Sequence, residues 1–174
     1  FMSDEVQCGL GRTGKWFVYQ HAGIQPDVVP LAKGLASGVP VGACVVGGRA
    51  KGVFKPGNHG STFGGNPLAM CGVVTTLDTM KEEDLLANAV RVGDAIRGGL
   101  AAALAGVAGV VEVRGMGLMI GVELDRPCGE IVKTALARGL VVNVTADSVI
   151  RLLPPLVMSE VEGRQVVERL APIV

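Results

Sequence analysis

The spacing of apolar and polar positions divides the chain into two parts of different character. In the first part, apolar runs at residues 27–32 and 41–46 predict buried strands, and residues 1–4 fit the end of another strand. A short amphipathic helix is expected at residues 15–21. Strand, helix and strand at this spacing predict a crossover unit in a parallel sheet, so we expect an α/β architecture here.

Helical patterns occupy the middle of the chain. Asn66 followed by Pro67 is a favourable helix start and predicts a helix that runs to about Met80. Thr79–Glu82 has the form of a capping box and predicts the start of a second helix. Apolar residues at helical spacing support this second helix: Leu85, Leu86, Ala89, Val90, Ile96, Leu100 and Leu104.

The pattern changes after Gly106, where short strands and helices follow one another in mixed order. The expected elements are strands at 110–113, 118–124, 140–144 and 149–153, a helix at 130–137, and a last helix that the capping box Ser159–Glu162 opens. This order predicts a small α+β domain. We place the boundary near residue 84, which gives domains at residues 1–84 and 85–174.

Composition and charge narrow the classes of function. Lys plus Arg and Asp plus Glu both number 16, and no basic face or tail is present, so we expect neither nucleic acid nor an anionic membrane as partner. The four cysteines lie far apart with no metal-ligand spacing, which favours reduced thiols in a cytoplasmic protein and no metal site. The apolar stretch at residues 100–111 is too short to span a membrane.

Asp4 and Lys33 are the first candidates for chemistry, because Asp4 lies at the end of one predicted strand and Lys33 directly follows another. The carboxyl ends of parallel strands meet at one edge of a sheet, where ligands bind. A carboxylate and an amine at that edge suit pyridoxal phosphate (PLP), whose aldehyde reacts with an amine and whose ring nitrogen needs an acid partner. Without further context, a Lys beside a Gly is usually a solvated surface residue.

The stretch Gly9–Lys15 offers a competing hypothesis, since it matches both the dinucleotide fingerprint and the P-loop pattern. Both motifs need a strand that runs directly into the first glycine, and here Asp4, Glu5 and Gln7 intervene. Trp16 also stands where a P-loop has a Ser or Thr for Mg²⁺. A plain glycine turn is the favoured interpretation, and a nucleotide-binding module is kept as an alternative.

Five segments, in order, resemble the class III aminotransferases and cover nearly the whole chain. They are Asp4–Gly14, Leu31–Ala43, His59–Ala69, Arg114–Gly121 and Ile150–Leu156. The resemblance implies PLP-dependent transferase fold type I, with the later part of the large parallel-sheet domain followed by the small domain. Family members are considerably longer, and the chain opens at Phe1 as if within a strand. We therefore expect a C-terminal part that binds PLP poorly without the first half.

The resemblance also implies residue roles. Lys33 would be the covalent anchor of the cofactor and the proton carrier, and Asp4 would bond the pyridine nitrogen. Val6 would pack on the ring, and Gln7 would reach the phenolic oxygen. The implied phosphate ligand is Thr62, which would serve the neighbouring subunit of a homodimer, with Ser61 beside the substrate. Arg151 would grip a substrate carboxylate. Cys8 replaces the usual Thr after Gln7, a departure expected to alter loop packing only.

The implied reaction is ping-pong transamination in arginine biosynthesis. Residues 59–69 are most similar to the branch of the family that transfers the δ-amino group of N-acetylornithine to 2-oxoglutarate. Another ω-aminotransferase, acting on ornithine, succinylornithine or 4-aminobutyrate, is the nearest alternative. A non-catalytic fragment that pairs with a partner chain is a further one.

Overall fold

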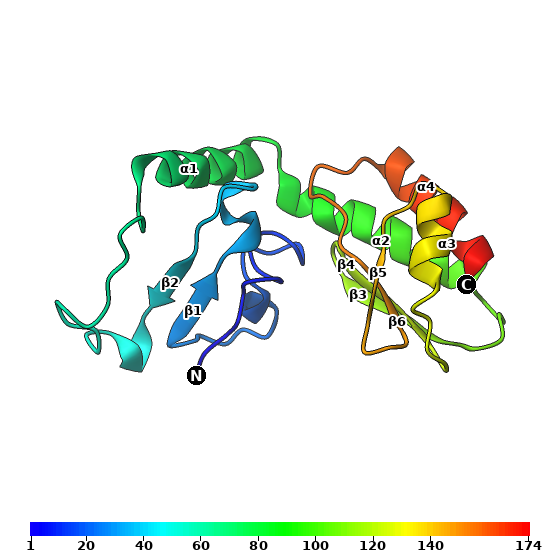
Figure 1. Ribbon diagram of the computed structural model, residues 1–174, viewed down its shortest axis with the longest axis horizontal. Helices are drawn as coiled ribbons and strands as arrows, with labels where there is room; N and C mark the ends of the chain where they lie inside the picture. The colour runs from blue at the N-terminus through cyan, green and yellow to red at the C-terminus, as the bar shows by residue number, and fades with distance from the viewer. The chain divides into compact units, whose positions relative to one another are not determined.

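The computed structural model describes all residues from Phe1 to Val174. The chain forms two compact units, Phe1–Leu86 and Ala87–Val174, which are described separately. Figure 1 shows the first unit in blue to green and the second in green to red. No helix of the chain combines the length and apolar character needed to cross a bilayer.

The first unit is built around strands β1 (Val28–Leu31) and β2 (Ala43–Val46), followed by helix α1 (Pro67–Glu82). Short 3-10 turns lie between them: η1 (Val18–His21), η2 (Lys33–Ala36) and η3 (Gly48–Ala50). The N-cap of α1 is as predicted, because the Asn66 side chain accepts a hydrogen bond from the Ala69 amide at 3.0 Å. Pro67 tolerates the first helical position because its missing N–H would have no intrahelical partner there.

Residues 1–5 run parallel to β1, as expected for the first two strands. The Val28 amide donates to the Phe1 carbonyl, the Ser3 amide to the Val28 carbonyl, and the Glu5 amide to the Pro30 carbonyl. Pro30 has no N–H to return a bond, so the ladder is interrupted and only the Met2–Val28 bridge is regular. This pairing places Asp4 opposite Pro30 at the end of β1.

The expected parallel sheet does not extend to the next strand, because β2 is antiparallel to β1, with Val28 opposite Val46 and Leu31 opposite Ala43. Residues 32–42 are too few for a crossover helix, which a parallel return would require. Instead the chain reverses through η2 and two residues with positive φ, Ser37 at 47° and Gly38 at 111°.

Two helix predictions in this unit also need correction. Residues 15–21 form only the short 3-10 turn η1, because the Val18 and Tyr19 amides bond to a distant carboxylate, that of Glu5, instead of to a preceding turn. Thr79–Glu82 opens no helix, since α1 continues through it and the Glu83 amide still donates to the Thr79 carbonyl. The break comes at Asp84, whose φ is +48°.

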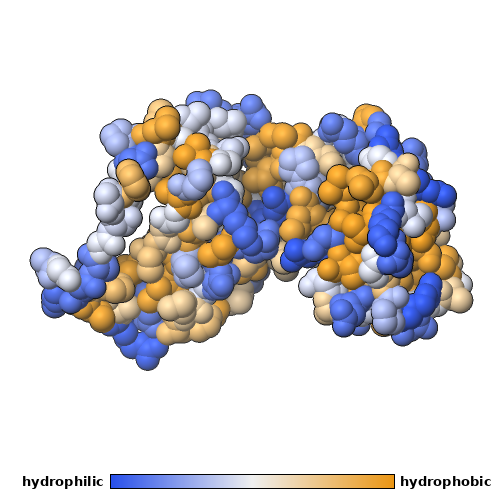
Figure 2. All heavy atoms as spheres, in the orientation of Figure 1, coloured by the Kyte–Doolittle hydropathy of each residue, from blue (hydrophilic) through white to orange (hydrophobic).

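A large part of the first unit is exposed to solvent, including some apolar side chains. Strand β2 is largely exposed, and every residue from 51 to 65 is exposed. Phe63, which precedes α1 in the sequence, is 83% exposed. Leu68, in the first turn of α1, is 75% exposed. Figure 2 shows apolar residues reaching the surface, drawn in orange.

The second unit contains most of helix α2 (Leu85–Ala103) and a four-stranded antiparallel sheet in the order β3-β4-β6-β5. The strands are β3 (Val110–Met116), β4 (Met119–Leu124), β5 (Asn143–Thr145) and β6 (Val149–Leu152). Helices α3 (Ile131–Ala137) and α4 (Glu160–Leu170) and the 3-10 turn η4 (Ala171–Ile173) complete it. These elements match the predicted order, and the Ser159–Glu162 capping box is confirmed.

One face of this sheet is covered by the helices. Residues alternate along β4 and β6, so that Ile120, Val122, Ile150 and Leu152 are buried. They share one core with the apolar stripe of α2, of which Ala89, Val92, Ile96, Leu100 and Leu104 are buried. Val90, predicted to belong to the same stripe, is 42% exposed. The opposite face of the sheet carries the polar residues.

Candidate functional site

The end of β1 and the end of the parallel segment beside it lie at one edge, as the sequence predicted. Lys33 follows β1, and its Nζ donates a hydrogen bond to Oε1 of Gln7 at 2.5 Å. Gln7 lies three residues after Asp4, just as Lys33 lies three residues after Pro30, the residue opposite Asp4. The amine at position 33 and the segment Asp4–Gln7 therefore face each other across the sheet edge.

Lys33 has an unusual backbone conformation. Its φ is +50°, in the left-handed region that non-glycine residues seldom adopt, and it begins the turn η2, with one residue between it and the end of β1. Such a conformation costs on the order of 1 kcal/mol and is found disproportionately at functional sites. The side chain is exposed, so its amine is accessible to a ligand.

Asp4 is also exposed, and one of its carboxylate oxygens already accepts a hydrogen bond within the chain. Its Oδ1 accepts a hydrogen bond from the Val6 amide at 3.0 Å, so the carboxylate caps the turn that follows the strand. No bond is made by Oδ2, which is available to a ligand. Val6 and Gln7 are half-buried, and Gln7 keeps its amide NH₂ group free while its oxygen is bonded to Lys33.

Glu5 supports this edge, a role that the sequence analysis missed. It is 1% exposed, and its carboxylate accepts hydrogen bonds from the Val18 amide at 2.9 Å, the Tyr19 amide at 3.1 Å and the Ser3 hydroxyl at 3.1 Å. These bonds tie the strand end to the far side of the glycine loop. The sequence contains one signal for this role. A carboxylate between two strand-end residues must either be exposed or accept hydrogen bonds from buried donors.

Cys8, the departure from the family pattern, lies against this carboxylate. Its Sγ donates to the Asp4 carbonyl at 3.2 Å and lies 3.8 Å from the Glu5 carboxylate. Burial, followed by the negative charge of Glu5, raises the pKa of the Cys8 thiol. The thiol therefore stays protonated and acts as a packing and donor group in the loop.

The segment with Ser61 and Thr62 is not brought to Lys33 by any contact. Both residues are exposed in the stretch 51–65. The Ser61 hydroxyl accepts a hydrogen bond from the Gly64 amide at 3.0 Å, which is the turn chemistry expected of a Ser between glycines. Thr62 makes no hydrogen bond within the chain, so its hydroxyl and amide remain available.

Arg151 lies in the second unit, on strand β6. It is half-buried, and its Nε donates to Oδ1 of Asn143 at 2.9 Å. Its two terminal nitrogens have no partner within the chain. The guanidinium can therefore bind a carboxylate by donating two parallel hydrogen bonds to it.

The geometry argues against a nucleotide site at Gly9–Lys15. The amides of Leu10 and Gly11 donate to the Trp16 carbonyl, and those of Arg12 and Gly14 donate within the loop. These N–H groups already donate hydrogen bonds within the turn, so they cannot donate to a phosphate. The Lys15 amine also bonds a backbone carbonyl, that of Gln20, at 3.2 Å.

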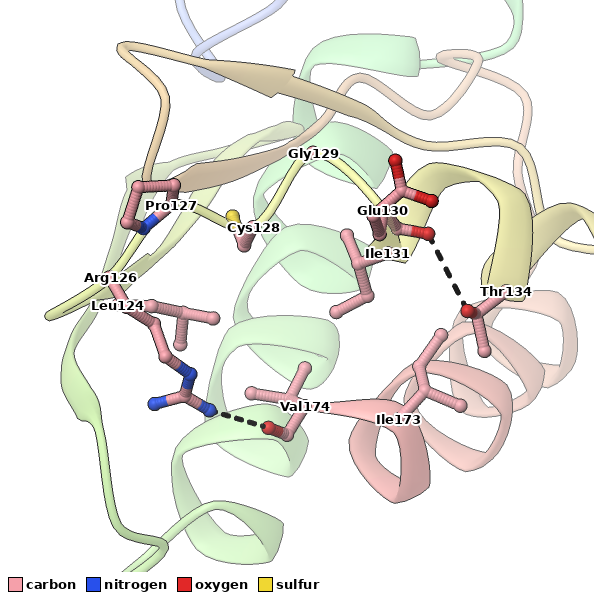
Figure 3. A pocket seen from close by; sticks show the side chains of 10 residues that line it. All are labelled: Leu124, Arg126, Pro127, Cys128, Gly129, Glu130, Ile131, Thr134, Ile173 and Val174. Carbon is pink, nitrogen blue, oxygen red and sulfur yellow. Dashed lines mark hydrogen bonds between the residues drawn. The ribbon is translucent and has the colours of Figure 1, made fainter.

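A hollow of about 400 Å³ in the second unit contains none of the predicted site residues. Figure 3 shows its lining, in which the Arg126 guanidinium bonds the Val174 carbonyl and the Thr134 hydroxyl bonds the Glu130 carbonyl. The rest of the wall is mostly apolar, and no cluster of three or more His, Cys, Asp or Glu side chains is placed to hold a metal anywhere in the chain.

The chain is similar to known proteins over nearly its whole length. The profile described as "Aminotransferase class-III" matches residues 1–174. Acetylornithine aminotransferase 1 of Bordetella bronchiseptica is 56% identical over 173 residues, which are 99% of this chain and 44% of the relative. Acetylornithine aminotransferase of Nitrosomonas europaea is 53% identical with the same coverage. The chain thus spans less than half the length of the curated relatives it matches.

Solved structures agree. Ornithine aminotransferase from Toxoplasma gondii, whose description names PLP at the active site, superposes with a TM-score of 0.92 at 37% identity over 99% of this chain and 42% of that one. Acetylornithine aminotransferase from Elizabethkingia anophelis gives 0.90 at 35% identity, covering 99% and 45%. The predicted fold class, PLP-dependent transferase fold type I, is confirmed with its mixed α/β character, and the chain belongs to the class III aminotransferase family.

Proposed function

We propose that this chain carries the lysine and part of the cofactor site of a PLP-dependent aminotransferase. The observation that carries the proposal is the contact between the Lys33 amine and the Gln7 side chain, 2.5 Å apart at the strand edge that also bears Asp4. Family membership supplies the cofactor expectation. The residues at the edge supply groups that fit it.

Four groups at this edge match four parts of the cofactor. A primary amine, Lys33, suits the aldehyde of PLP, and a carboxylate with a free oxygen, Asp4, suits its ring nitrogen. The free NH₂ group of Gln7 suits the phenolic oxygen, and Val6 offers an apolar surface for the ring. When bound, PLP supplies an electron sink for the carbon that bears the substrate's amino group.

The chain's own residues would then hold and move protons. Lys33 Nζ takes the proton from the substrate carbon that bears the amino group and later returns a proton, as general base and acid. Asp4, as a carboxylate, keeps the ring nitrogen protonated. Arg151 binds a substrate carboxylate, Ser61 lies beside the substrate, and Thr62 donates to the cofactor phosphate.

For substrates, we propose N-acetylornithine as amino donor and 2-oxoglutarate as acceptor, the reaction of arginine biosynthesis. The support is that the relatives with 53 and 56% identity are named acetylornithine aminotransferase. Ornithine, succinylornithine and 4-aminobutyrate are the alternative donors.

We also propose a cytoplasmic homodimer in which Thr62 serves the neighbouring subunit. In support, Thr62 is exposed and makes no hydrogen bond within the chain, and two large apolar side chains further along the chain, Phe63 and Leu68, are also exposed. Residues 1–84 would be the later portion of the cofactor-binding domain and residues 85–174 the small domain.

Replacement of the lysine tests the proposal in the complete protein. Lys33→Ala should lower turnover of N-acetylornithine with 2-oxoglutarate by several orders of magnitude, because both the covalent anchor and the proton carrier are lost. Lys15→Ala, whose amine bonds only a backbone carbonyl, is the control and should keep normal turnover. Full activity of Lys33→Ala would reject the proposal, and rates on the four amines would identify the donor.

A further inference from the structure

The outer face of the second unit's sheet presents Arg151 between two short neighbours. Ile150 and Leu152 point into the core, so Arg151 lies on the opposite face of β6. The register places Asn143 of β5 directly beside it on one side and Gly121 of β4 on the other. Cross-strand neighbours share a face, so these three residues form one row across the sheet.

Asn143 fixes one edge of the guanidinium. The hydrogen bond from Arg151 Nε to Asn143 Oδ1, at 2.9 Å, occupies the side edge through which Nε and one terminal nitrogen could bind a carboxylate together. The end edge, formed by the two terminal nitrogens, stays free. A planar guanidinium held in this way can bind a carboxylate only end-on, through two parallel hydrogen bonds.

The same face carries a second arginine with a different arrangement. Arg114 of β3 pairs with Glu112 at 3.0 Å and with Glu123, so its charge is compensated within the sheet. Arg151 contacts no carboxylate, although its side chain is half-buried. An amide neighbour orients the guanidinium without neutralising it, which leaves its charge available for an anionic ligand.

Gly121 is the neighbour of Arg151 on the other side of the row. It has no side chain beside the stem of Arg151, and a Cβ there would already lie 3.2 Å from Val149 Cγ1. The row therefore combines a polar support on one flank of Arg151 with a residue that has no side chain on the other.

We propose that Asn143 is a positioning residue that holds the Arg151 guanidinium end-on for the carboxylate of glutamate and 2-oxoglutarate. This inference rests on the proposed function for the identity of the ligand. The hydrogen bond from Arg151 to Asn143 makes a dicarboxylate bind more tightly, because the Arg151 side chain is already ordered before binding. Part of the entropic cost of immobilising it is thereby avoided.

Two substitutions separate positioning from simple structural support. Asn143→Ala in the complete protein should raise KM for 2-oxoglutarate about three- to tenfold, the effect of freeing one rotamer-rich side chain. Asn143→Asp should raise it further, because the new carboxylate pairs with Arg151 and competes with the substrate. If Asn143 served only the fold, Asp, which has nearly its shape, would be the milder change.

Thr145→Ala, on the same strand and face, is the matched control and should leave KM unchanged, with thermal midpoints recorded for all variants. Equilibrium binding of 2-oxoglutarate by calorimetry should follow the same order, and it does not depend on turnover. Binding that weakens in this order in a protein without transaminase activity would reject the proposed function and retain this inference. Equal affinity of wild type, Asn143→Ala and Asn143→Asp, or no binding by the wild type, would overturn it.

Discussion

Glu5 shows how a single buried residue organises the candidate site. Its carboxylate receives two backbone amides and a hydroxyl, and the amides belong to residues 13 and 14 positions further along the chain. The neighbours on both sides, Asp4 and Val6, belong to the proposed cofactor site. The strand edge is therefore held in place by a residue that takes no part in the proposed chemistry.

Loss of this acceptor should be costly. Glu5→Gln is expected to lower the free energy of unfolding by about 1–3 kcal/mol, because an NH₂ group would face backbone N–H donors and leave one of them unsatisfied. Urea denaturation measures the change. Asp4→Asn is the control, because Asp4 is exposed and Asn retains the oxygen that caps Val6. Equal stability of the two variants would contradict the role given to Glu5.

At the scale of elements, helix α2 is held close to the sheet by a glycine. A Cβ at Gly93 would collide with the carbonyl oxygen of Gly117, in the turn between β3 and β4, so the backbones of helix and turn lie in contact. Gly98 lies on the exposed side of the same helix, and a Cβ there would have no neighbouring atom within 4 Å. Nothing therefore opposes a larger residue at position 98.

These two positions should respond in opposite directions. Gly93→Ala is expected to destabilise the protein by about 1–3 kcal/mol through overpacking. Gly98→Ala should stabilise it by about 0.5–1 kcal/mol, because Ala restricts the unfolded chain and favours helix. Thermal unfolding of both variants checks the pair. Destabilisation by Gly98→Ala as large as that by Gly93→Ala would show that the close contact is not the cause.

The start of α4 makes a prediction about pH. The Ser159 amide and hydroxyl both donate to Glu162 Oε2 at 2.8 Å, and these bonds lower the pKa of Glu162 below its ordinary value of 4.5. Since the folded pKa is the lower one, the cap contributes its full stability above pH 4.5 and loses it as the pH falls through the folded value.

Glu162→Gln should therefore reduce the loss in thermal midpoint between about pH 7 and about pH 3, relative to the wild type. Glu168→Gln on the same helix is the control, because its side chain is exposed and makes no hydrogen bond. A wild-type acid response in Glu162→Gln would contradict the capping role.

For the whole molecule, the elements of the second unit could be predicted because strong local signals agree with the tertiary structure. The Ser159–Glu162 box and the apolar stripe of α2 are examples. The direction of β2 could not, because it depends on how residues 32–42 turn, and this turn passes through positive φ at Ser37 and Gly38. The capping-box pattern at Thr79 predicted a helix start that does not form, because α1 continues through it.

Some residues of the candidate site could likewise be predicted from the sequence, and others could not. The strand ends and a motif placed Asp4, Gln7 and Lys33 at one edge, and the contact between Gln7 and Lys33 accords with that placement. Glu5 and Asn143 were missed, because their importance lies in hydrogen bonds to residues that are distant in sequence or on a neighbouring strand. Such partners become visible only once the fold brings them together.

Reduction of the PLP-treated complete protein with borohydride, followed by peptide mass mapping, tests the central claim most directly. Reduction makes the bond between the cofactor and its lysine permanent, so the labelled residue can be identified. The account predicts a pyridoxyl group on the peptide that contains Lys33. A label confined to another lysine, such as Lys15 or Lys55, or no label at all, would contradict it.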